Sequence, residues 1–296
     1  MIDARTQLVG LIGWPVEHSL SPVMHNAAFV ELRMNWCYLP LPVHPQRVGT
    51  ALAGLTALGF RGANVTIPHK RSVLSVLSSL SPKARALGAV NTLVIEQDGG
   101  RTIRGENTDA VGFTTALGEA GFSAAGSNAL IVGSGGGACA AIYALITSKA
   151  DAVTILSRRV AKAQEIVDSF TVKPQNGTRL RAAELRAESL IGCAADADLL
   201  VNATPVGMWP AVERSIWPEG KPVPPHLTVF DLVYNPHHTR LLQQALSSGA
   251  RAISGLEMLV QQGARSFAMW TNRQAPIETM RQACKQQLVD EVGSIG

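Results

Sequence analysis

The sequence has little cysteine and little charge. Its four cysteines lie far apart along 296 residues and form no Cys-x-x-Cys pair, which favours a reduced, cytoplasmic protein over a disulfide framework. Charged residues make up only 16% of the chain, and the formal net charge is +4. The basic residues are scattered and form no basic cluster of the kind that nucleic-acid-binding proteins carry. We therefore expect no nucleic-acid partner.

Several catalytic motifs are also missing. The chain contains no His-x-x-x-His or His-Glu-x-x-His pair and no Walker A motif, so we expect no metal site and no P-loop. Val132 occupies the first position that a Gly-x-Ser-x-Gly nucleophile elbow requires to be glycine. Residues 1–5 lack the pattern of a signal peptide. The apolar run 129–147 is interrupted by glycines, which indicates a buried strand turning into a helix rather than a membrane span.

Length and patterning predict two domains. The chain is 46% hydrophobic, which suffices for two cores of ordinary size. Strand-like and helix-like segments alternate in both halves, a pattern typical of an α/β fold with mostly parallel sheets. Ser21 followed by Pro22 predicts a helix start with Ser21 as its N-cap. Residues 98–100 predict the turn of a hairpin, and the five prolines within 208–226 predict a long loop.

Residues 129–138 combine a strand, a glycine turn and a helix start. Gly133, Gly135 and Ala138 have the spacing G-x-G-x-x-A, in which the first glycine permits a tight turn and the second lets the backbone approach a pyrophosphate. The helix start adds free N–H groups and a dipole that favours an anion. Because the spacing lies in the required strand–turn–helix context, it predicts a dinucleotide site rather than a turn alone.

The residues after the next strand select the cofactor. An NAD site has an acidic side chain there for the ribose 2′-hydroxyl, whereas an NADP site has a cation for the 2′-phosphate. This chain has Ser157, Arg158 and Arg159, with Lys162 one turn later. Cations at a helix start oppose the helix dipole, so an exposed basic helix start is the less satisfactory explanation. The pattern favours NADP over NAD.

Polar residues of the first half lie where strands end and helices begin. Ser19 and Ser21 lie at a strand-to-helix turn beside free N–H groups, which suits a carboxylate, although a cap alone would also explain Ser21. Lys70 follows by one turn a strand that ends at Thr66. Ligands of open α/β sheets bind at the carboxyl ends of strands, so this lysine is placed to exchange a proton with a carbonyl or an alcohol. Most lysines, however, are simply solvated.

Two further polar residues complete the candidate substrate site. Asn91 offers a donor and an acceptor that suit a substrate hydroxyl. Asp109 could pair with Lys70 and orient it, or could serve only the dipole of the helix that it begins.

Together these segments resemble the shikimate dehydrogenase family, from about residue 13 to residue 270. One such motif would be weak, but their number, order and spacing are specific. The motifs that carry the resemblance are HSLSP at 18–22, NVTIPHK at 64–70, GAVNT at 88–92, NTD at 107–109, the glycine turn at 133, NATPVGM at 202–208, DLVYNP at 231–236 and GLEMLVQQ at 255–262.

The resemblance implies the fold and the activity of that family. It implies an N-terminal, mostly parallel-sheet substrate domain (1–110 with 258–296) and a Rossmann-like NADP domain (111–257), with the last helices returning to the first domain. It implies reversible reduction of 3-dehydroshikimate to shikimate by NADPH, in aromatic amino-acid biosynthesis. A monomer or homodimer without a membrane partner is expected.

The resemblance also implies residue roles. Lys70 and Asp109 match the catalytic pair. The matching substrate contacts are Ser19, Ser21, Thr66, Lys70, Asn91, Asp109, Tyr234 and Gln262. The matching cofactor contacts are Gly133, Ser134, Gly135, Gly136, Gly137, Ala138, Ser157, Arg158, Arg159, Lys162, Thr204, Leu232 and Gly255.

The chain departs from the family in places, and two other functions stay open. Many members have Asn-Arg-Thr at 157–159 and Arg at 162, but the positive charge is kept here. Asn272 replaces a common glycine. One alternative is a quinate/shikimate dehydrogenase that also uses NAD. The other is a non-catalytic sensor of a shikimate-like ligand, against which the presence of both Lys70 and Asp109 argues.

Overall fold

The computed structural model describes residues 2–96, 102–171 and 177–293. The chain folds as two compact units, residues 1–111 with 260–296 and residues 112–259. It passes from the first unit to the second within α5 (Asp109–Glu119) and back within α10 (Gly255–Thr271). We refer to the two as unit 1 and unit 2.

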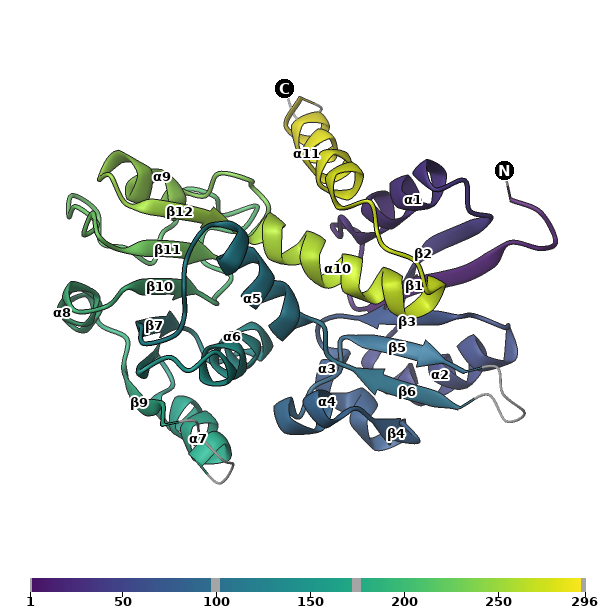
Figure 1. Ribbon diagram of the computed structural model, residues 1–296, viewed down its shortest axis with the longest axis horizontal. Helices are drawn as coiled ribbons and strands as arrows, with labels where there is room; N and C mark the ends of the chain where they lie inside the picture. Colours follow the sequence, from purple (N-terminus) through teal and green to yellow (C-terminus); the bar gives the residue numbers. More distant parts are fainter. Residues whose placement is uncertain (1, 97–101, 172–176, 294–296) are drawn as a thin grey trace. The chain divides into compact units, whose positions relative to one another are not determined.

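Unit 1 is built on a mixed six-stranded sheet. Its strands lie in the order β2-β1-β3-β5-β6-β4 (Figure 1). Strands β1, β2 and β3 run parallel, whereas β5 is antiparallel to both β3 and β6. Its elements are β1 (Gln7–Gly13), α1 (Ser21–Glu31), β2 (Trp36–Pro42), η1 (Pro45–Arg47), α2 (Val48–Ala57), β3 (Gly62–Val65), α3 (His69–Ser72), η2 (Val73–Val76), β4 (Ser79–Leu80), α4 (Pro82–Leu87), β5 (Thr92–Ile95), β6 (Ile103–Glu106), most of α10, and α11 (Ile277–Gly293).

One core of unit 1 lies between the sheet and α2. Val48, Leu52 and Leu55 recur at helical spacing and are buried against Val65 and Leu93 of the sheet. The strands β3 and β5 are buried at every position, as expected for central strands that are covered on both faces. These buried strands give the site at their ends a rigid base.

Aromatic rings fill a second core of unit 1, between α1, β2 and α10. The imidazole of His25 stacks on Tyr38 with a centroid separation of 4.5 Å and an interplanar angle of 5°. Phe29, Phe267 and Trp270 surround it. Tyr38 lies on β2 and Phe267 on α10, far apart in the sequence. The cluster therefore packs the returning helix α10 against the first strands of the unit.

Unit 2 is built on a parallel six-stranded sheet with the order β12-β11-β10-β7-β8-β9 (Figure 1). Buried Leu, Ile and Val residues dominate its central strands, as expected for a parallel sheet. Its elements are the rest of α5, β7 (Asn128–Val132), α6 (Gly136–Thr147), β8 (Ala152–Ser157), α7 (Val160–Thr171), β9 (Arg179–Glu184), α8 (Ala187–Ala195), β10 (Leu199–Asn202), β11 (Thr228–Asp231), α9 (Arg240–Ser247), β12 (Arg251–Ser254) and the start of α10.

The predicted α/β class with a Rossmann-like second unit is confirmed. The prediction that Ser21 caps α1 is wrong, since Leu20 is the N-cap and Ser21 is the first helical residue. Residues 208–226 contain no helix or strand, as predicted. The turn at 98–100 lies outside the described residues. No helix among the described residues is long and apolar enough to cross a membrane.

His25 generates a prediction about acid stability. It is fully buried, neither ring nitrogen has a hydrogen-bond partner among the described residues, and burial lowers its pKa from 6.5 to about 3. In the unfolded chain His25 is therefore protonated below about pH 6.5, whereas in the folded chain it stays neutral down to about pH 3. The stability from this neutral imidazole is complete above the unfolded pKa and is lost as the pH falls through that window.

At about pH 5 the loss amounts to about 2 kcal/mol. The substitution His25→Leu removes the titrating group and is expected to flatten the fall in unfolding free energy between about pH 7 and pH 5. Urea unfolding of both proteins across this range measures the difference. Parallel pH profiles for the two proteins would show that His25 does not titrate in this way.

Candidate active site

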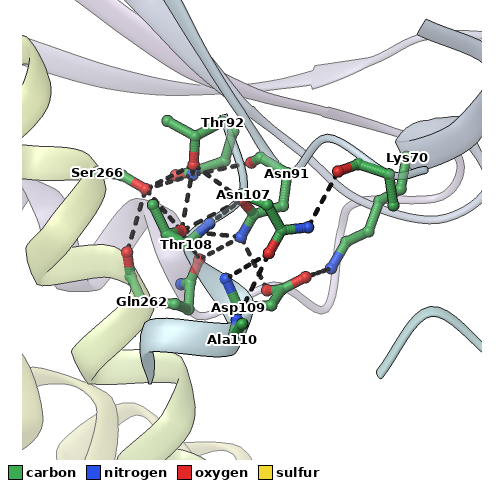
Figure 2. Close-up of polar contacts among 11 residues, drawn as sticks. Lys70, Asn91, Thr92, Asn107, Thr108, Asp109, Ala110, Gln262 and Ser266 are labelled. Carbon is green, nitrogen blue, oxygen red and sulfur yellow. Dashed lines mark hydrogen bonds and ion pairs between the residues drawn. The ribbon is translucent and has the colours of Figure 1, made fainter. Parts of the chain in front are cut away.

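An ion pair between Lys70 and Asp109 lies at the centre of the polar cluster in unit 1. Lys70 on α3 donates from Nζ to Oδ2 of Asp109, the first residue of α5, at 2.6 Å (Figure 2). The Lys70 side chain is 24% exposed and that of Asp109 only 9%. Asn107 orients the aspartate, because its Oδ1 accepts the N–H of Asp109 while its Nδ2 donates to the carbonyl of Ala89.

Asn91 connects this ion pair to the sheet. Its side chain is buried directly before β5, and Nδ2 donates to Oδ1 of Asp109 at 2.8 Å. The same nitrogen lies 2.9 Å from Oγ1 of Thr108 and 3.2 Å from Oε1 of Gln262. Oδ1 of Asn91 accepts the backbone N–H of Thr108 at 2.7 Å. One amide thus holds the side chain of Asp109 on α5 next to Gln262 of α10.

Helix α10 closes the cluster from one side. Gln262 and Ser266 are four residues apart and therefore share a helix face, which points toward β5 in Figure 2. The hydroxyls of Ser266 and Thr92 share a hydrogen bond of 2.8 Å, and Asn64 of β3 donates to Ser266 at 3.0 Å. The polar side chains of two strands (β3 and β5) and three helices (α3, α5 and α10) form one continuous network.

The network extends to α1 through a buried phenol. Tyr38 donates its hydroxyl to Oδ1 of Asn64 at 2.9 Å and is also hydrogen-bonded to the side chain of Ser21. Burial raises the pKa of Tyr38 well above its usual range, so the phenol stays protonated and keeps its donor. Ser19 accepts the N–H of Ser21 and borders a cavity of about 370 Å³.

The cluster has the parts needed for proton exchange with a bound alcohol or ketone. An ammonium can make three hydrogen bonds, and only one of those of Lys70 is used by Asp109. Asn91 and Gln262 add amide groups that suit hydroxyls. Among the described residues, no three His, Cys, Asp or Glu side chains gather as a metal ion would require.

A second set of candidate residues lies along the carboxyl edge of the sheet in unit 2. The strand register aligns Ser254, Asp231, Asn202, Val132 and Leu156 in one row across five strands. The residues that directly follow this row form what we call the rim: Gly255, Leu232, Ala203, Gly133 and Ser157.

The glycines of the rim permit close backbone approach. A Cβ on Gly133, which has φ +119°, would lie 2.8 Å from the carbonyl oxygen of Ala203. A Cβ on Gly255 would lie 2.4 Å from the carbonyl oxygen of Leu232. Gly135 caps α6 with no atom near the place of a Cβ, so the helix start with its unpaired N–H groups is open to a phosphate group.

The basic residues follow β8 on the same edge. Ser157 bonds to Ser134 of the glycine turn at 3.1 Å and accepts the N–H of Arg159 at 3.1 Å. Arg158 and Arg159 are exposed, and neither has a carboxylate partner within the described part of the chain. The glycine cradle and these two free guanidinium groups fit a dinucleotide with a 2′-phosphate.

Comparisons with known proteins agree along nearly the whole chain. The profile "Shikimate dehydrogenase substrate binding domain" matches residues 11–93, and "Shikimate / quinate 5-dehydrogenase" matches residues 116–213. "Shikimate 5'-dehydrogenase C-terminal domain" matches residues 255–285. The curated shikimate dehydrogenase (NADP⁺) of Methanopyrus kandleri is 44% identical over 97% of this chain and 98% of its own. The chain belongs to the shikimate dehydrogenase family.

Solved structures of the family extend the comparison. Shikimate 5-dehydrogenase from Listeria monocytogenes, in complex with shikimate and NAD, is 34% identical, with a TM-score of 0.86 over 95% of this chain and 97% of its own. The Thermus thermophilus enzyme, in complex with NADP(H) and shikimate, is 34% identical, with a TM-score of 0.83 over 95% of this chain and 99% of its own. The fold of this chain is therefore the fold of the shikimate dehydrogenases.

Of the predicted substrate contacts, Lys70, Asn91, Asp109 and Gln262 meet in one hydrogen-bonded cluster. Ser21 joins it through Tyr38, and Thr66 lies one turn before Lys70, against Gly13. Tyr234 belongs to unit 2. The roles of all these residues stay predictions. Sequence reasoning did not single out Tyr38, Asn64, Thr92, Thr108 and Ser266, although Asn64, Thr92 and Thr108 stand inside motifs that it used.

The two glycines of the turn should respond differently to alanine. Gly133→Ala places a side chain at φ +119° and against a carbonyl oxygen, which should cost about 1–3 kcal/mol of unfolding free energy. Gly135→Ala introduces its methyl into open space and should cost about 1 kcal/mol or less. Urea unfolding compares the two variants. Equal losses would mean that the turn does not have this geometry.

Proposed function

We propose that this chain catalyses the reversible reduction of 3-dehydroshikimate to shikimate with NADPH. The observation that carries the proposal is the Lys70–Asp109 ion pair, held by Asn91 in a chain of the shikimate dehydrogenase family. Unit 1 binds the substrate and unit 2 binds NADP. The proposed bounds are 1–110 with 258–296 for the first function and 111–257 for the second.

Lys70 holds the proton that the reduced product needs. Its Nζ donates one hydrogen to Asp109, which aims the ammonium and leaves its other hydrogens for the carbonyl oxygen of the substrate. When bound, NADPH supplies the hydride that adds to the carbonyl carbon. The proton passes from Nζ to the resulting alkoxide oxygen, so the charges balance. In the reverse direction the neutral amine accepts the proton of the alcohol.

The remaining polar residues orient the ring. Asn91, Asp109, Thr66 and Gln262 bind the hydroxyls, since amide and carboxylate oxygens accept them and amide N–H groups donate to them. Ser19 and Ser21 bind the carboxylate at the start of α1, and Tyr234 contributes a further carboxylate contact. Holding the ring against Lys70 contributes strongly to the rate, because fixed geometry can lower an activation barrier by about 7–11 kcal/mol.

Residues of the rim and its neighbours bind NADP. Gly133–Ala138 form the pyrophosphate cradle, and Thr204, Leu232 and Gly255 line the rest of the edge. Ser157, Arg158, Arg159 and Lys162 bind the adenosine end, where guanidinium groups match a 2′-phosphate. This proposal is supported by the NADP⁺ names of the curated relatives.

Those relatives give no support to a quinate/shikimate dehydrogenase that also uses NAD, or to a non-catalytic sensor of a shikimate-like ligand. We propose a cytoplasmic monomer or homodimer whose partner is a small molecule. Light scattering on a size-exclusion column measures the oligomeric state.

Removing the acid–base group tests the reaction. Lys70→Ala is expected to lower kcat by about a thousandfold, within the range for general acid–base catalysis, and to change the KM for shikimate less than about threefold. Reduced cofactor absorbance during shikimate oxidation measures both constants. Lys285→Ala on α11 is the matched control and should leave them unchanged. If Lys70→Ala keeps wild-type turnover, the acid–base assignment is wrong.

Removing the guanidinium groups tests the cofactor. Arg158→Ala and Arg159→Ala are each expected to raise the KM for NADP about tenfold, because a charge-assisted contact to the phosphate is lost. The KM for NAD, which has no 2′-phosphate, should not change. Initial rates with both cofactors give the comparison. A parallel rise for both cofactors would assign these arginines a different role.

A further inference from the structure

Unit 2 buries a carboxylate that the proposed reaction does not use. Asp231 ends β11, is 0% exposed and lies on a strand that pairs with β12 on one side and β10 on the other. Its Oδ1 accepts the Nδ2 hydrogen of Asn202 at 2.9 Å and the N–H of Val233 at 3.1 Å. Its Oδ2 accepts the hydroxyl of Thr239 at 2.6 Å. Burial raises the pKa of Asp231 to about 6, which reflects the cost of burying its charge. A buried carboxylate of this kind calls for a structural or functional reason.

Asn202 connects Asp231 to the loop that follows β10. Its Oδ1 accepts the N–H of Thr204 at 3.1 Å and the Thr204 hydroxyl at 2.7 Å. Its Nδ2 also donates to the carbonyl of Val206 at 3.1 Å. The Thr204 hydroxyl in turn accepts the N–H of Val206. The loop after β10 is therefore folded around one amide group.

The chemistry of a carboxylate determines which way that amide faces. An ionised carboxylate only accepts hydrogen bonds, whereas an amide side chain has one accepting end and one donating end. Asp231 therefore requires Nδ2 of Asn202 on its own side, which leaves Oδ1 facing Thr204. An apolar residue at 231 would remove this requirement and leave the amide held only by its contacts to Thr204 and Val206.

The position of the pair relates it to the rim. Asp231 and Asn202 are direct register partners, and Leu232, the rim residue after Asp231, donates its N–H to the carbonyl of Asn202 at 3.0 Å. The side chain of Thr204 lies against Gly133, since a Cβ there would be 3.1 Å from its Cγ2. The two side chains thus support the rim from the row beneath it.

We propose that Asp231 is a positioning residue for the dinucleotide, which acts through the amide of Asn202 to hold Thr204 and the adjoining rim in their binding geometry. The inference rests on the proposed function, in that the rim must bind NADP. Asp231 itself touches neither the substrate nor the cofactor in this proposal. Its effect is on cofactor affinity rather than on proton transfer.

Four variants test the proposal: Asp231→Ala, Asn202→Ala, the double variant, and Thr239→Val. Titration of NADPH fluorescence gives the dissociation constant without any turnover. Each of the first two substitutions should raise that constant about tenfold, the scale of one lost charged hydrogen bond. The double variant should bind NADPH no more weakly than whichever single variant binds it less tightly, because the two residues act as one unit. The KM for NADP should rise likewise, with the KM for shikimate unchanged.

Thr239→Val is the matched control for a purely structural role. It removes the contact to the other carboxylate oxygen and the hydroxyl that caps α9, so it should lower the melting temperature. It should leave the NADPH dissociation constant at the wild-type value, because the Asn202 contact persists. A variant set in which affinity follows melting temperature, Thr239→Val included, would overturn the proposal.

Two further outcomes would also overturn it. Asn202→Ala with wild-type affinity would do so even if Asp231→Ala does not fold, and additive effects in the double variant would show that the residues act separately. Failure of the proposed function is a different result. In that case the wild-type protein itself binds no NADPH and oxidises no shikimate.

Discussion

A side-chain amide that is buried at the end of a strand needs partners for both its oxygen and its nitrogen, and this requirement organises each unit. In unit 1, Asn91 meets it with Thr108 on one side and Asp109 on the other. In unit 2, Asn202 meets it with Thr204 and Asp231. An unpaired buried group would cost about 1–3 kcal/mol, so each amide enforces one arrangement of the segments around it. The candidate sites are precise because these amides have no second way to be satisfied.

Sheet topology decides which segments reach each amide. In unit 1 the antiparallel pairing of β5 with β6 places Thr92 opposite Glu106, so the start of one strand lies beside the end of the other. Asn91 and Asp109, which are separated by 18 residues, become neighbours for this reason. The backbone of Val90 also bonds to the carbonyl of Lys70, which brings α3 to the same place. In unit 2 every strand is parallel, so all carboxyl ends share one edge and the rim follows from register alone.

The sequence predicted the helices and strands whose apolar residues recur at regular spacing, and it missed others such as β4 and β9. The strand–turn–helix at 129–138 and the alternating pattern of both halves were sufficient for the α/β class, because buried strands and glycine turns leave local signals. Ser21 was misassigned as a cap, since a Ser-Pro pair has the same local pattern whether the serine precedes the helix or begins it. The short strand β4 and the strand β9 left no such signal. Ser266 joins the network only because α10 packs against β5, and no motif marks it.

By itself the sequence determined which chemical groups are present and where each stands relative to a strand or helix end: a lysine one turn beyond a strand, glycines at a turn, two arginines in place of an acid. These are local properties of the chain, and the motifs record them. Only the tertiary structure decided which groups meet. The contact of Tyr38 with Asn64, the orientation of Asn202 by Asp231 and the return of Gln262 to Asn91 join residues that are 26, 29 and 171 positions apart. Contacts over such separations depend on strand order and register, which arise from the packing of the whole unit.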